Sequence, residues 1–360
     1  MVEVYLEHIT KIFGNVVAVD DLTLKFREGH LTSLLGPSGC GKTTTLRIIA
    51  GLETPTKGRV YFDEQDVTDV PTEKRDIALV FQIPTIYPTM NVYDNLAFPL
   101  RVKGLSKQDI DRRVKEVSEL MGISHVLDRM PSALDAGTTQ KVALAHAFIK
   151  EPGVYLLDEP LTNVDPVTRI ELRTLLKEIQ RKYKATMVYV THDQTESMTL
   201  ADYIAVMRLG KLLQFDTPEK IYMAPKNTFV GWFIGNPGMN FLDVTFDQRK
   251  GALIGEGFEY RLSEEFKRIL AEKNATEVKL GIRPEHILVK RGAEQEGIKA
   301  KCTLIEPFSG DRKILHLEVG GMELKAKVSV SLDIKEGEIV SLEFSPEYIH
   351  IYDKAGELII

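Results

Sequence analysis

The segment that most constrains this chain reads Gly36-Pro37-Ser38-Gly39-Cys40-Gly41-Lys42-Thr43 and matches the pattern G-x-x-x-x-G-K-[ST]. It follows a short apolar run and precedes a helical pattern over Lys42–Ala50. When a glycine-rich loop joins a strand to a helix, the backbone N–H groups of the loop point toward phosphate oxygens. The positive N-terminal end of the helix faces the same oxygens. The sequence therefore predicts a nucleotide site, in which Lys42 reaches the β- and γ-phosphates and Thr43 binds Mg²⁺. The residues expected to surround the phosphates are Pro37, Ser38, Gly39, Cys40, Gly41, Lys42, Thr43 and Thr44.

Three short runs, LTSLLG, VYLLDE and MVYVTH, are apolar throughout and end in polar or glycine-rich turns. Continuous hydrophobicity is typical of strands buried on both faces of a parallel sheet, and ligands collect at the carboxyl ends of such strands. We therefore expect Asp158 to hold Mg²⁺, directly or through water. Glu159 is expected to polarise an attacking water, and His192 to hydrogen-bond the γ-phosphate. In isolation these residues would suggest a solvated strand end and a structural histidine, but their shared sheet with the glycine-rich loop favours the functional interpretation.

Helical patterns separate the strands. Asp165 is a candidate N-cap, and Pro166 is the first residue of a helix with an apolar stripe. That stripe is expected to consist of Ile170, Leu172, Leu176 and Ile179. Between the first two strands lies a mostly helical insert over about residues 84–150, in which Ser106 caps a helix that Gly122 ends.

The character of the sequence changes near GNPGMN, residues 235–240. Beyond it, alternating segments such as KILHLEVGGMELKAKV predict β-strands, and Gly320-Gly321 suits a hairpin turn. A chain of 360 residues that is 43% hydrophobic can build two domains. We expect an α/β nucleotide-binding domain over residues 1–236 and a mainly β domain over residues 237–360.

Charge and cysteine content narrow the function. The formal net charge is −6, and the second domain has 18 Lys and Arg against 22 Asp and Glu, which argues against a nucleic-acid partner. Cys40 and Cys302 lie far apart and match no metal-ligand spacing, as expected of a reduced, intracellular protein. The N-terminal residues lack the apolar core of a signal peptide, and no apolar run approaches the roughly 20 residues of a membrane span. Any role at a membrane is therefore expected to come through a partner.

The order of these motifs resembles that of the ATPase subunits of ABC importers, most closely those of the maltose and glycerol-phosphate type. The resemblance covers essentially the whole chain. It includes the P-loop, a Q-loop at Gln82 in VFQIP, and a Walker B strand over Val154–Asp158 with Glu159 after it. It also includes a D-loop over Thr162–Asp165 and a switch histidine, His192. The later segment GIRPEHI is similar to part of that family's C-terminal regulatory domain. The resemblance implies an α/β P-loop NTPase with a helical subdomain, followed by an all-β domain of the OB/TOBE kind.

The same resemblance implies ATP and Mg²⁺ as ligands and ATP hydrolysis coupled to solute translocation. It assigns catalysis to Glu159, His192, Gln82 and Lys42, and it adds Gln82 to the Mg²⁺ site as a sensor of the nucleotide state. Phe13 falls where the family stacks an aromatic ring on adenine. From the residues alone, a core aromatic in an N-terminal strand is an equally good interpretation.

Membrane partners also follow from the resemblance. The segment IPTIYPTMNVYDNLAFPL, residues 83–100, is expected to form much of the docking surface for two integral membrane permease subunits. An extracytoplasmic solute-binding protein would take part indirectly, and the chain would lie on the cytoplasmic face of the cell membrane. The alternative is that these apolar residues pack the helical insert, which must be true of some of them.

One segment departs from the family. Residues 134–138, the signature segment, read LDAGT where the family has Leu-Ser-Gly-Gly-Gln, and in the ATP-bound dimer of that family the signature contacts the γ-phosphate held by the other subunit. Asp135 remains a good N-cap worth about 1 kcal/mol, as serine would be. Facing a phosphate about 4 Å away at an effective dielectric constant near 20, however, its charge is repelled by roughly 4 kcal/mol. Ala136 adds a Cβ where the family allows close approach, Gly137 is unchanged, and Thr138 shortens the reach of the glutamine.

A chain with a complete P-loop and a poor signature would leave a homodimer without a fully competent site. We therefore expect a second, non-identical ATPase subunit with an intact signature. A homodimeric importer ATPase and a largely regulatory subunit with weak hydrolysis are the alternatives, and the intact Glu159 argues against the regulatory one. Soluble ABC-type ATPases that act on ribosomes or DNA usually carry two P-loop halves or a long coiled-coil insert, which this chain lacks. The solute, whether a carbohydrate, a polyol or a glycerol phosphate, follows from the resemblance alone.

Overall fold

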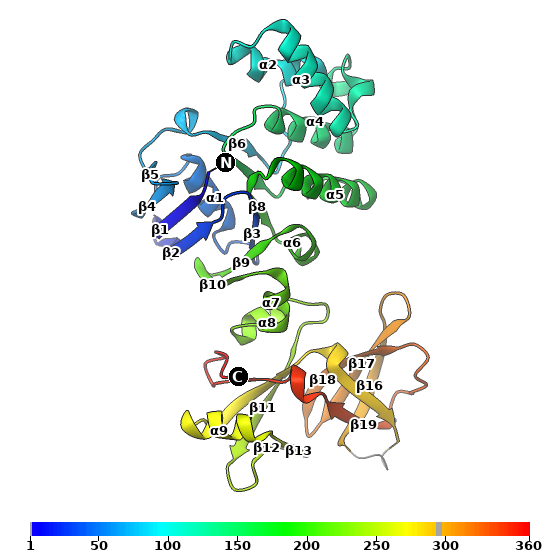
Figure 1. Cartoon of the computed structure of the whole chain (residues 1–360). Helices are drawn as coiled ribbons and strands as arrows, with labels where there is room; N and C mark the ends of the chain where they lie inside the picture. The colour runs from blue at the N-terminus through cyan, green and yellow to red at the C-terminus, as the bar shows by residue number, and fades with distance from the viewer. Residues whose placement is uncertain (1, 293–296) are drawn as a thin grey trace. The chain divides into compact units, whose positions relative to one another are not determined.

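The computed structural model describes residues 2–292 and 297–360. The chain divides between Pro218 and Glu219 into two compact units (Figure 1). The boundary expected from the sequence lies between residues 236 and 237, and the short helices α7 (Pro218–Met223) and α8 (Thr228–Phe233) occupy the stretch between the two positions. Among the described residues, no helix combines the length and apolar character that crossing a bilayer requires.

A six-stranded sheet with the order β10-β9-β3-β8-β7-β6 forms the centre of the N-terminal unit. Neighbours from β9 to β6 are parallel, and β10 closes one edge in the antiparallel sense. Every residue of β3, β7 and β8 is buried, so the three strands predicted from continuous hydrophobicity are confirmed. The strands are β3 (Leu31–Leu35), β6 (Ile77–Val80), β7 (Val154–Asp158), β8 (Thr186–Thr191), β9 (Tyr203–Arg208) and β10 (Lys211–Asp216).

A second, antiparallel sheet with the order β2-β1-β4-β5 was not predicted from the sequence. Its strands are β1 (Val4–Phe13), β2 (Val16–Phe26), β4 (Lys57–Phe62) and β5 (Gln65–Asp66). Helix α1 (Lys42–Ala50) begins and ends where the sequence predicts. Its buried apolar residues share one hydrophobic cluster with both sheets, so the helix that follows the P-loop is held from two sides (Figure 1).

The helical insert contains α2 (Val92–Val102), α3 (Lys107–Leu120) and α4 (Ala136–Phe148), with 3₁₀ turns at Ser124–Val126 and Pro131–Ala133. A further 3₁₀ turn, Thr72–Lys74, precedes β6. Ser106 caps α3 through a hydrogen bond to the backbone N–H of Asp109, and Gly122 beyond its end has a φ of 68°, as the sequence predicts.

Helix α5 (Pro166–Tyr183) starts at the predicted N-cap, Asp165. Three members of its predicted apolar stripe, at positions 172, 176 and 179, are buried. Ile170 is 56% exposed, so its place in that stripe was wrong. With 3.6 residues per turn, Ile170 lies about 200° from Leu172 around the helix axis and therefore faces the other side. Helix α6 (Gln194–Leu200) follows β8 after a two-residue connection.

The C-terminal unit contains two five-stranded sheets, β13-β12-β11-β14-β20 and β15-β19-β16-β17-β18, around one apolar core, which confirms the predicted all-β architecture. Its elements are β11 (Asn240–Asp247), β12 (Ala252–Gly255), β13 (Phe258–Arg261), α9 (Glu264–Glu272), β14 (Glu277–Ile282), the 3₁₀ turn Pro284–His286, β15 (Ile287–Arg291), β16 (Ile298–Pro307), β17 (Arg312–Val319), β18 (Met322–Ser329), β19 (Ile339–Phe344), the 3₁₀ turn Pro346–Tyr348 and β20 (His350–Tyr352).

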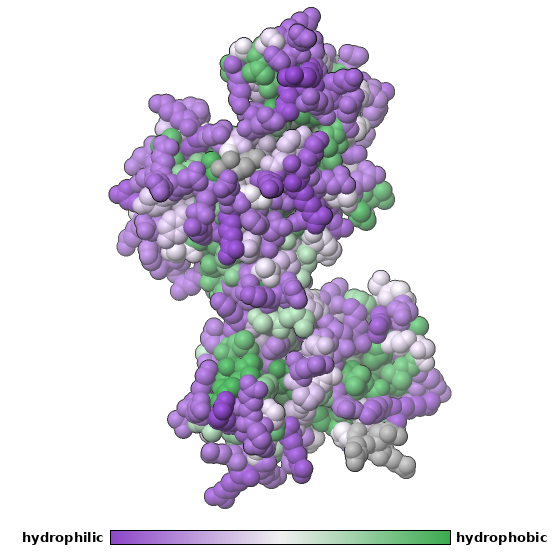
Figure 2. Space-filling view, viewed as in Figure 1, coloured by the Kyte–Doolittle hydropathy of each residue, from purple (hydrophilic) through white to green (hydrophobic). Residues whose placement is uncertain are grey.

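The predicted Gly-Gly hairpin joins β17 to β18, and both glycines have positive φ. A Cβ on Gly320 would lie 1.6 Å from the carbonyl oxygen of Glu256, so this turn of the second sheet leaves no room for a side chain against the first. In the space-filling view, apolar areas of the visible face are largest on this unit (Figure 2).

The segment with α7 and α8 is tied to the β domain by a buried arginine. Arg283, 2% exposed, donates to the carbonyl oxygen of Tyr222 at 2.6 and 3.0 Å and to that of Ile234 at 2.6 Å. Its guanidinium carbon lies 3.6 Å from the centroid of the Tyr222 ring. The Tyr352 hydroxyl donates to the carbonyl oxygen of Pro225 at 3.1 Å. These contacts anchor the segment to strands that are much later in the sequence.

Candidate functional site

The glycines of the P-loop are required by close packing. A Cβ on Gly36 would lie 2.3 Å from the carbonyl oxygen of Met207, and one on Gly41 would lie 2.4 Å from that of Ala18. Gly41 also has a φ of 103°, which L side chains rarely adopt. The loop therefore keeps its curved course only with glycine at these positions. It borders a cavity of about 340 Å³ whose lining is Phe13, Ala18, Ser38, Gly39, Gly41, Lys42, Thr43, Thr44 and Glu159.

Lys42 lies within the curve of this loop. Its buried Nζ donates to the carbonyl oxygens of Gly36 at 2.8 Å and Pro37 at 3.0 Å. The neighbouring Cys40 thiol is buried too, and burial raises its pKa, so it remains a neutral packing group. The ammonium is thus a fixed positive charge at the cavity wall.

Thr43, which lines the cavity, contacts Asp158 at the end of β7. The Thr43 hydroxyl donates to Asp158 Oδ1 at 3.0 Å. Burial raises the pKa of Asp158, while the hydrogen bond from Thr43 acts in the opposite direction. Among the described residues no three Asp, Glu, His or Cys side chains cluster as metal ligands. A hydroxyl and one carboxylate beside a phosphate site nevertheless suit Mg²⁺, which binds few protein groups and takes its other ligands from phosphate oxygens and water.

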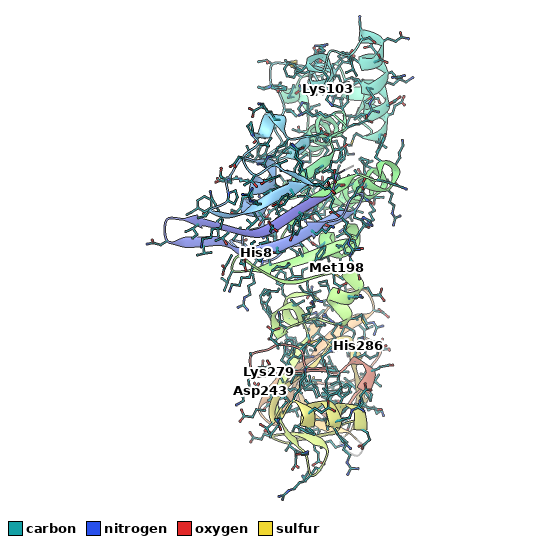
Figure 3. All side chains as sticks on the ribbon, turned by 60° about the vertical axis from the view of Figure 1, so that its left-hand side comes forward. His8, Lys103, Met198, Asp243, Lys279 and His286 are labelled. Atoms are coloured by element: carbon teal, nitrogen blue, oxygen red, sulfur yellow. The ribbon has the colours of Figure 1, made fainter. Side chains whose placement is uncertain are left out.

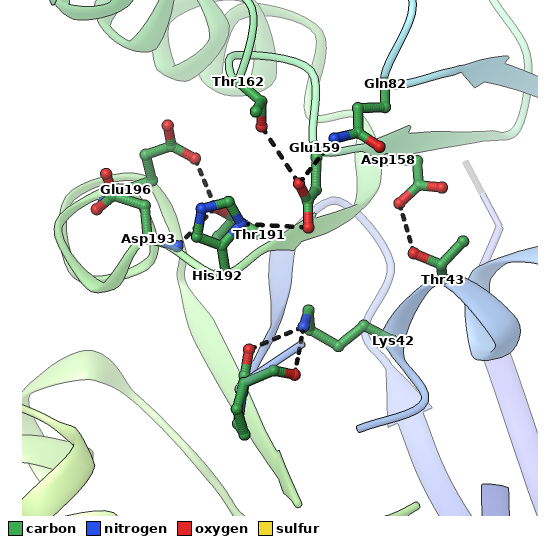
Figure 4. A network of polar contacts seen from close by, with 12 residues as sticks. Lys42, Thr43, Gln82, Asp158, Glu159, Thr162, Thr191, His192, Asp193 and Glu196 are labelled. Carbon is green, nitrogen blue, oxygen red and sulfur yellow. Dashed lines mark hydrogen bonds and ion pairs between the residues drawn. The ribbon is translucent and has the colours of Figure 1, made fainter. Parts of the chain in front are cut away.

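Glu159 lies at the centre of the polar network in Figure 4. Its backbone is in the left-handed region, with φ 45°, and its N–H donates to the carbonyl oxygen of Val190 at 2.9 Å. His192 Nδ1 lies 3.3 Å from Oε1 of the carboxylate. Oε2 accepts from Gln82 Nε2 and from the Thr162 hydroxyl, both at 3.3 Å. Residues from three separate segments therefore converge on one carboxylate.

Two contacts of this network were not predicted from the sequence. The first is the hydrogen bond from Thr162 to Glu159. The second is the hydrogen bond from Asn163 Nδ2 to the carbonyl oxygen of Gln82 at 3.0 Å, which joins the D-loop to the Q-loop. Both residues belong to the D-loop, but the sequence pattern does not indicate which side chains of that loop turn inward.

Phe13 ends β1 at the rim of the same cavity. The ring is 45% exposed, so it is not a core aromatic. Lys11 Nζ lies 4.8 Å from the ring centroid, a distance at which an ammonium group is attracted to an aromatic face. An exposed ring beside the P-loop is available to a planar ligand group.

The signature segment lies at the start of α4. Among the described residues, none of this segment lines the P-loop cavity. Asp135 is the N-cap: Oδ1 accepts from the backbone N–H of Thr138 at 2.8 Å, and Oδ2 accepts from the Thr138 hydroxyl at 2.9 Å. These two hydrogen bonds hold the pKa of Asp135 below its usual value. The carboxylate is exposed and ionised.

Helix α4, which begins in the signature segment, contacts helix α5, which follows the D-loop, at Gly137. This glycine is buried, and a Cβ on it would lie 2.9 Å from Cγ2 of Thr168 in the first turn of α5. That turn is capped by Asp165, whose pKa is lowered by the hydroxyl and backbone N–H of Thr168. Asp135 and Ala136, by contrast, point to solvent.

The P-loop, the Asp158 and Glu159 pair at the end of β7 and the histidine at the end of β8 define a P-loop ATPase of the α/β class. Family models match in the same order: the ABC transporter family over residues 19–162, the MalK OB fold domain over 235–287 and the TOBE domain over 280–351. The chain belongs to the family of ATP-binding proteins of ABC transporters, and it is an ATPase.

Relatives cover the chain from end to end. The trehalose/maltose import ATP-binding protein MalK of Thermococcus litoralis is 42% identical over 367 residues, which is 98% of each chain. The multiple sugar-binding transport ATP-binding protein MsmK of Streptococcus mutans is 39% identical over the full length of both.

Two solved structures resemble the ATPase unit. One is cbiO1 of Clostridium perfringens, part of an ABC transporter complex, with a TM-score of 0.57 at 27% identity, covering 61% of this chain and 89% of that one. The other is a dimeric ATP-binding cassette bound to ADP and Pi, with a TM-score of 0.55 at 28% identity, covering 60% and 98%.

Proposed function

We propose that this chain is the energy-coupling subunit of an importer for a sugar or a related polyol or glycerol-phosphate solute. It would act on the cytoplasmic face of the cell membrane with two integral permease subunits, supplied by an extracytoplasmic solute-binding protein. The names of the relatives, trehalose/maltose import and multiple sugar-binding transport, support this solute class. The observation that carries the catalytic part is Glu159, held by Gln82, Thr162 and His192 at the wall of the P-loop cavity.

Each residue has a distinct part in the proposed reaction. Lys42 places its positive charge against the β- and γ-phosphates, and Thr43, Asp158 and Gln82 would hold Mg²⁺. When bound, Mg²⁺ neutralises charge on the phosphate oxygens. Glu159 orients a water and accepts its proton as the oxygen attacks the γ-phosphorus, the bond to the bridging oxygen breaks and ADP leaves. His192 donates to the γ-phosphate, and Phe13 stacks on adenine.

Replacing the base tests this assignment. In the assembled transporter, Glu159→Gln should lower the rate of ATP hydrolysis by about 10²- to 10⁴-fold while ATP binding persists, because the amide cannot accept the proton. Glu116→Gln, an exposed glutamate on α3, is the matched control and should hydrolyse ATP at the wild-type rate. Unchanged hydrolysis in Glu159→Gln would remove Glu159 from the mechanism. An assembled wild-type transporter in which this chain's site shows no turnover would favour the regulatory alternative.

A groove lined by residues of the helical insert and by residues between Glu73 and Ile77 supports docking to permeases. It has a volume of about 350 Å³, and its lining includes Tyr87, Phe98, Val102, Lys103 and His146. Lys103 marks its region in Figure 3. Ile83, at the start of the predicted docking segment, is 74% exposed. Other residues of that segment, Val92, Leu96 and Leu100, are buried in α2, so the segment both packs the insert and offers an apolar surface.

The signature segment supports a pair of different ATPase subunits. Asp135 is exposed and ionised, and its hydrogen-bond donors come from its own helix, so its charge would meet the partner's nucleotide without a counter-ion from this segment. A second ATPase with an intact signature would complete the site built on Lys42 and Glu159. Purification of the tagged chain from native membranes, with mass spectrometry of every ATPase present, tests this. Two different ATPases in equal amounts support it, and one alone contradicts it.

The charge argument has its own test. Asp135→Ser should tighten ATP-dependent association of the two ATPase subunits at the partner's site by at least tenfold, because a like-charge repulsion of several kcal/mol is removed. Asp128→Ser, an exposed aspartate of the same insert, changes the net charge equally and should leave association unchanged. If Asp135→Ser behaves like Asp128→Ser, repulsion does not limit closure.

A further inference from the structure

The imidazole of His192 depends on its backbone for its direction. The side chain is 53% exposed, and its Nδ1 lies 3.3 Å from Oε1 of Glu159, the proposed catalytic carboxylate. His192 lies in the connection between β8 and α6, just before a helix of seven residues. Whatever fixes Thr191 and Asp193, on either side of it, therefore also fixes the imidazole.

A buried carboxylate lies directly behind this connection. Glu196, on α6, is 4% exposed. Its Oε2 accepts from the Tyr189 hydroxyl at 2.8 Å and from the Thr191 hydroxyl at 2.7 Å. Burial, and then the Glu196 charge, raise the pKa of Tyr189 well above its usual value, so the phenol remains a donor. The two residues that donate these hydrogen bonds, Tyr189 and Thr191, both belong to β8.

Such an arrangement is unusual for a core. Among the described residues no lysine, arginine or histidine forms an ion pair with Glu196, and the hydrogen bonds that its side chain accepts come from two hydroxyl groups. Burying a charge in this way is unfavourable compared with an apolar side chain of similar size. The glutamate is therefore explained by the geometry it imposes rather than by stability.

The hydrogen bonds continue from Glu196 to both neighbours of His192 (Figure 4). The Thr191 hydroxyl that donates to Glu196 accepts from the backbone N–H of Asp193 at 3.0 Å. Asp193 Oδ1 accepts from the backbone N–H of Glu196 at 3.1 Å, which closes a ring around His192. One helical position further on, Ser197 hydrogen-bonds Ser33 of β3 at 2.7 Å, so the ring is tied to the strand that leads into the P-loop.

We propose that Glu196 is a positioning residue for catalysis, which holds the backbone on both sides of His192 through the Thr191 hydroxyl and so sets the direction of the imidazole toward Glu159 and the γ-phosphate. The proposal rests on the role given to His192 above. Glu196 touches no reacting group itself, and its effect passes through His192. A glutamine at this position keeps an oxygen that can accept from both hydroxyls, whereas an alanine keeps neither hydrogen bond.

Enzyme kinetics on the assembled transporter test the proposal. Glu196→Ala should lower kcat for ATP hydrolysis by about 10- to 100-fold, the size expected for a misplaced catalytic group, with the KM for ATP within threefold of wild type. Glu196→Gln should return kcat to within threefold of wild type. Thr191→Val, which keeps the shape of the side chain and removes the hydroxyl, should reproduce the loss. Its matched control is Thr199→Val, because the exposed Thr199 bonds only carbonyl oxygens of its own helix and should hydrolyse normally.

The double variant His192→Ala/Glu196→Ala separates positioning from general destabilisation. If Glu196 acts through His192, the double variant should have the kcat of His192→Ala alone. A further loss of the same factor in the His192→Ala background would overturn the proposal, as would wild-type kcat in Thr191→Val. If Glu196→Ala does not fold, Thr191→Val carries the same comparison. A His192→Ala variant with wild-type kcat would instead disprove the proposed role of His192, and the inference with it.

Discussion

The buried carboxylate of Asp158 destabilises the folded chain when it is ionised. Its carboxylate is buried, and burial raises its pKa, so the folded chain binds a proton there more readily than the unfolded chain does. The ionised form therefore destabilises the fold above that pKa, and the penalty disappears as the pH falls and the group is protonated. The carboxylate accepts a hydrogen bond from the Thr43 hydroxyl, and under the proposed function both groups would bind the same cation.

Replacing Asp158 should expose this cost. Without nucleotide, Asp158→Asn should raise the free energy of unfolding at pH 7.5 by an amount on the order of 1 kcal/mol, the size of a typical single substitution. Urea denaturation measures the difference, which should shrink at pH 4. The variant should also lose the increase in Tm that Mg²⁺ and ATP give the wild type. A less stable variant at pH 7.5 would mean that the hydrogen bond from Thr43 outweighs desolvation.

The sequence predicts the residues of the site better than their partners. The P-loop pattern and the ends of buried strands identify Lys42, Thr43, Asp158, Glu159 and His192 because each lies at a fixed offset from a recognisable element. For Glu196, the position in its helix suggests the wrong hydrogen-bond partner. With Asp193 as N-cap, it occupies the third helical position, where a glutamate usually reaches back to the N-cap N–H. In the structure that N–H is bonded to Thr191 instead, which frees Glu196 for Tyr189 and Thr191.

Among the elements, the parallel sheet was predicted and the antiparallel one was not. Strands β3, β7 and β8 are buried at every position, whereas β1 alternates irregularly. His8 in β1 and Asp21 in β2 both have positive φ, and the register between the two strands shifts nearby. Such a bulge moves later side chains to the opposite face and breaks the period of two on which strand prediction depends.

Helix α4 should make the N-terminal unit sensitive to acid. His146, on this helix, has its ring nearly perpendicular to that of Tyr87, with the centroids 6.0 Å apart. Burial lowers the pKa of His146 to about 4, with a smaller effect from Lys150. In the unfolded chain its pKa is near 6.5. A group with a lowered pKa stabilises the fold above pH 6.5, and that stability is lost as the pH falls toward 4.

Replacing the histidine should remove this part of the acid sensitivity. Between pH 7 and pH 4, wild type should lose up to about 3 kcal/mol of unfolding free energy that His146→Phe retains. Denaturant titrations at both pH values measure it. His125→Phe, an exposed histidine of the same insert, is the control and should show the wild-type loss. An equal loss in all three proteins would place the acid sensitivity elsewhere.

At the scale of the whole molecule, the position of the boundary between the two units determines which C-terminal fragment is stable. The fragment 219–360 contains the carbonyl oxygens that Arg283 binds at Tyr222 and Ile234, whereas the fragment 237–360 leaves that buried guanidinium without them. We expect 219–360 to fold alone and 237–360 to be less stable by at least 3 kcal/mol, because a buried charge loses its partners. Denaturation of both fragments, followed by circular dichroism, gives the comparison. Equal stability would support a boundary at residues 236 and 237.

The contact between Gly137 and Thr168 limits how this signature can evolve. Two of the three positions that differ from the family pattern, Asp135 and Ala136, point to solvent, while Gly137, which matches it, is packed against another helix. A substitution at Asp135 or Ala136 therefore disturbs no packing within this chain, and in the proposed pair of ATPase subunits its effect would fall on the partner. Under the proposed function, the second ATPase subunit is where a complementary change is expected.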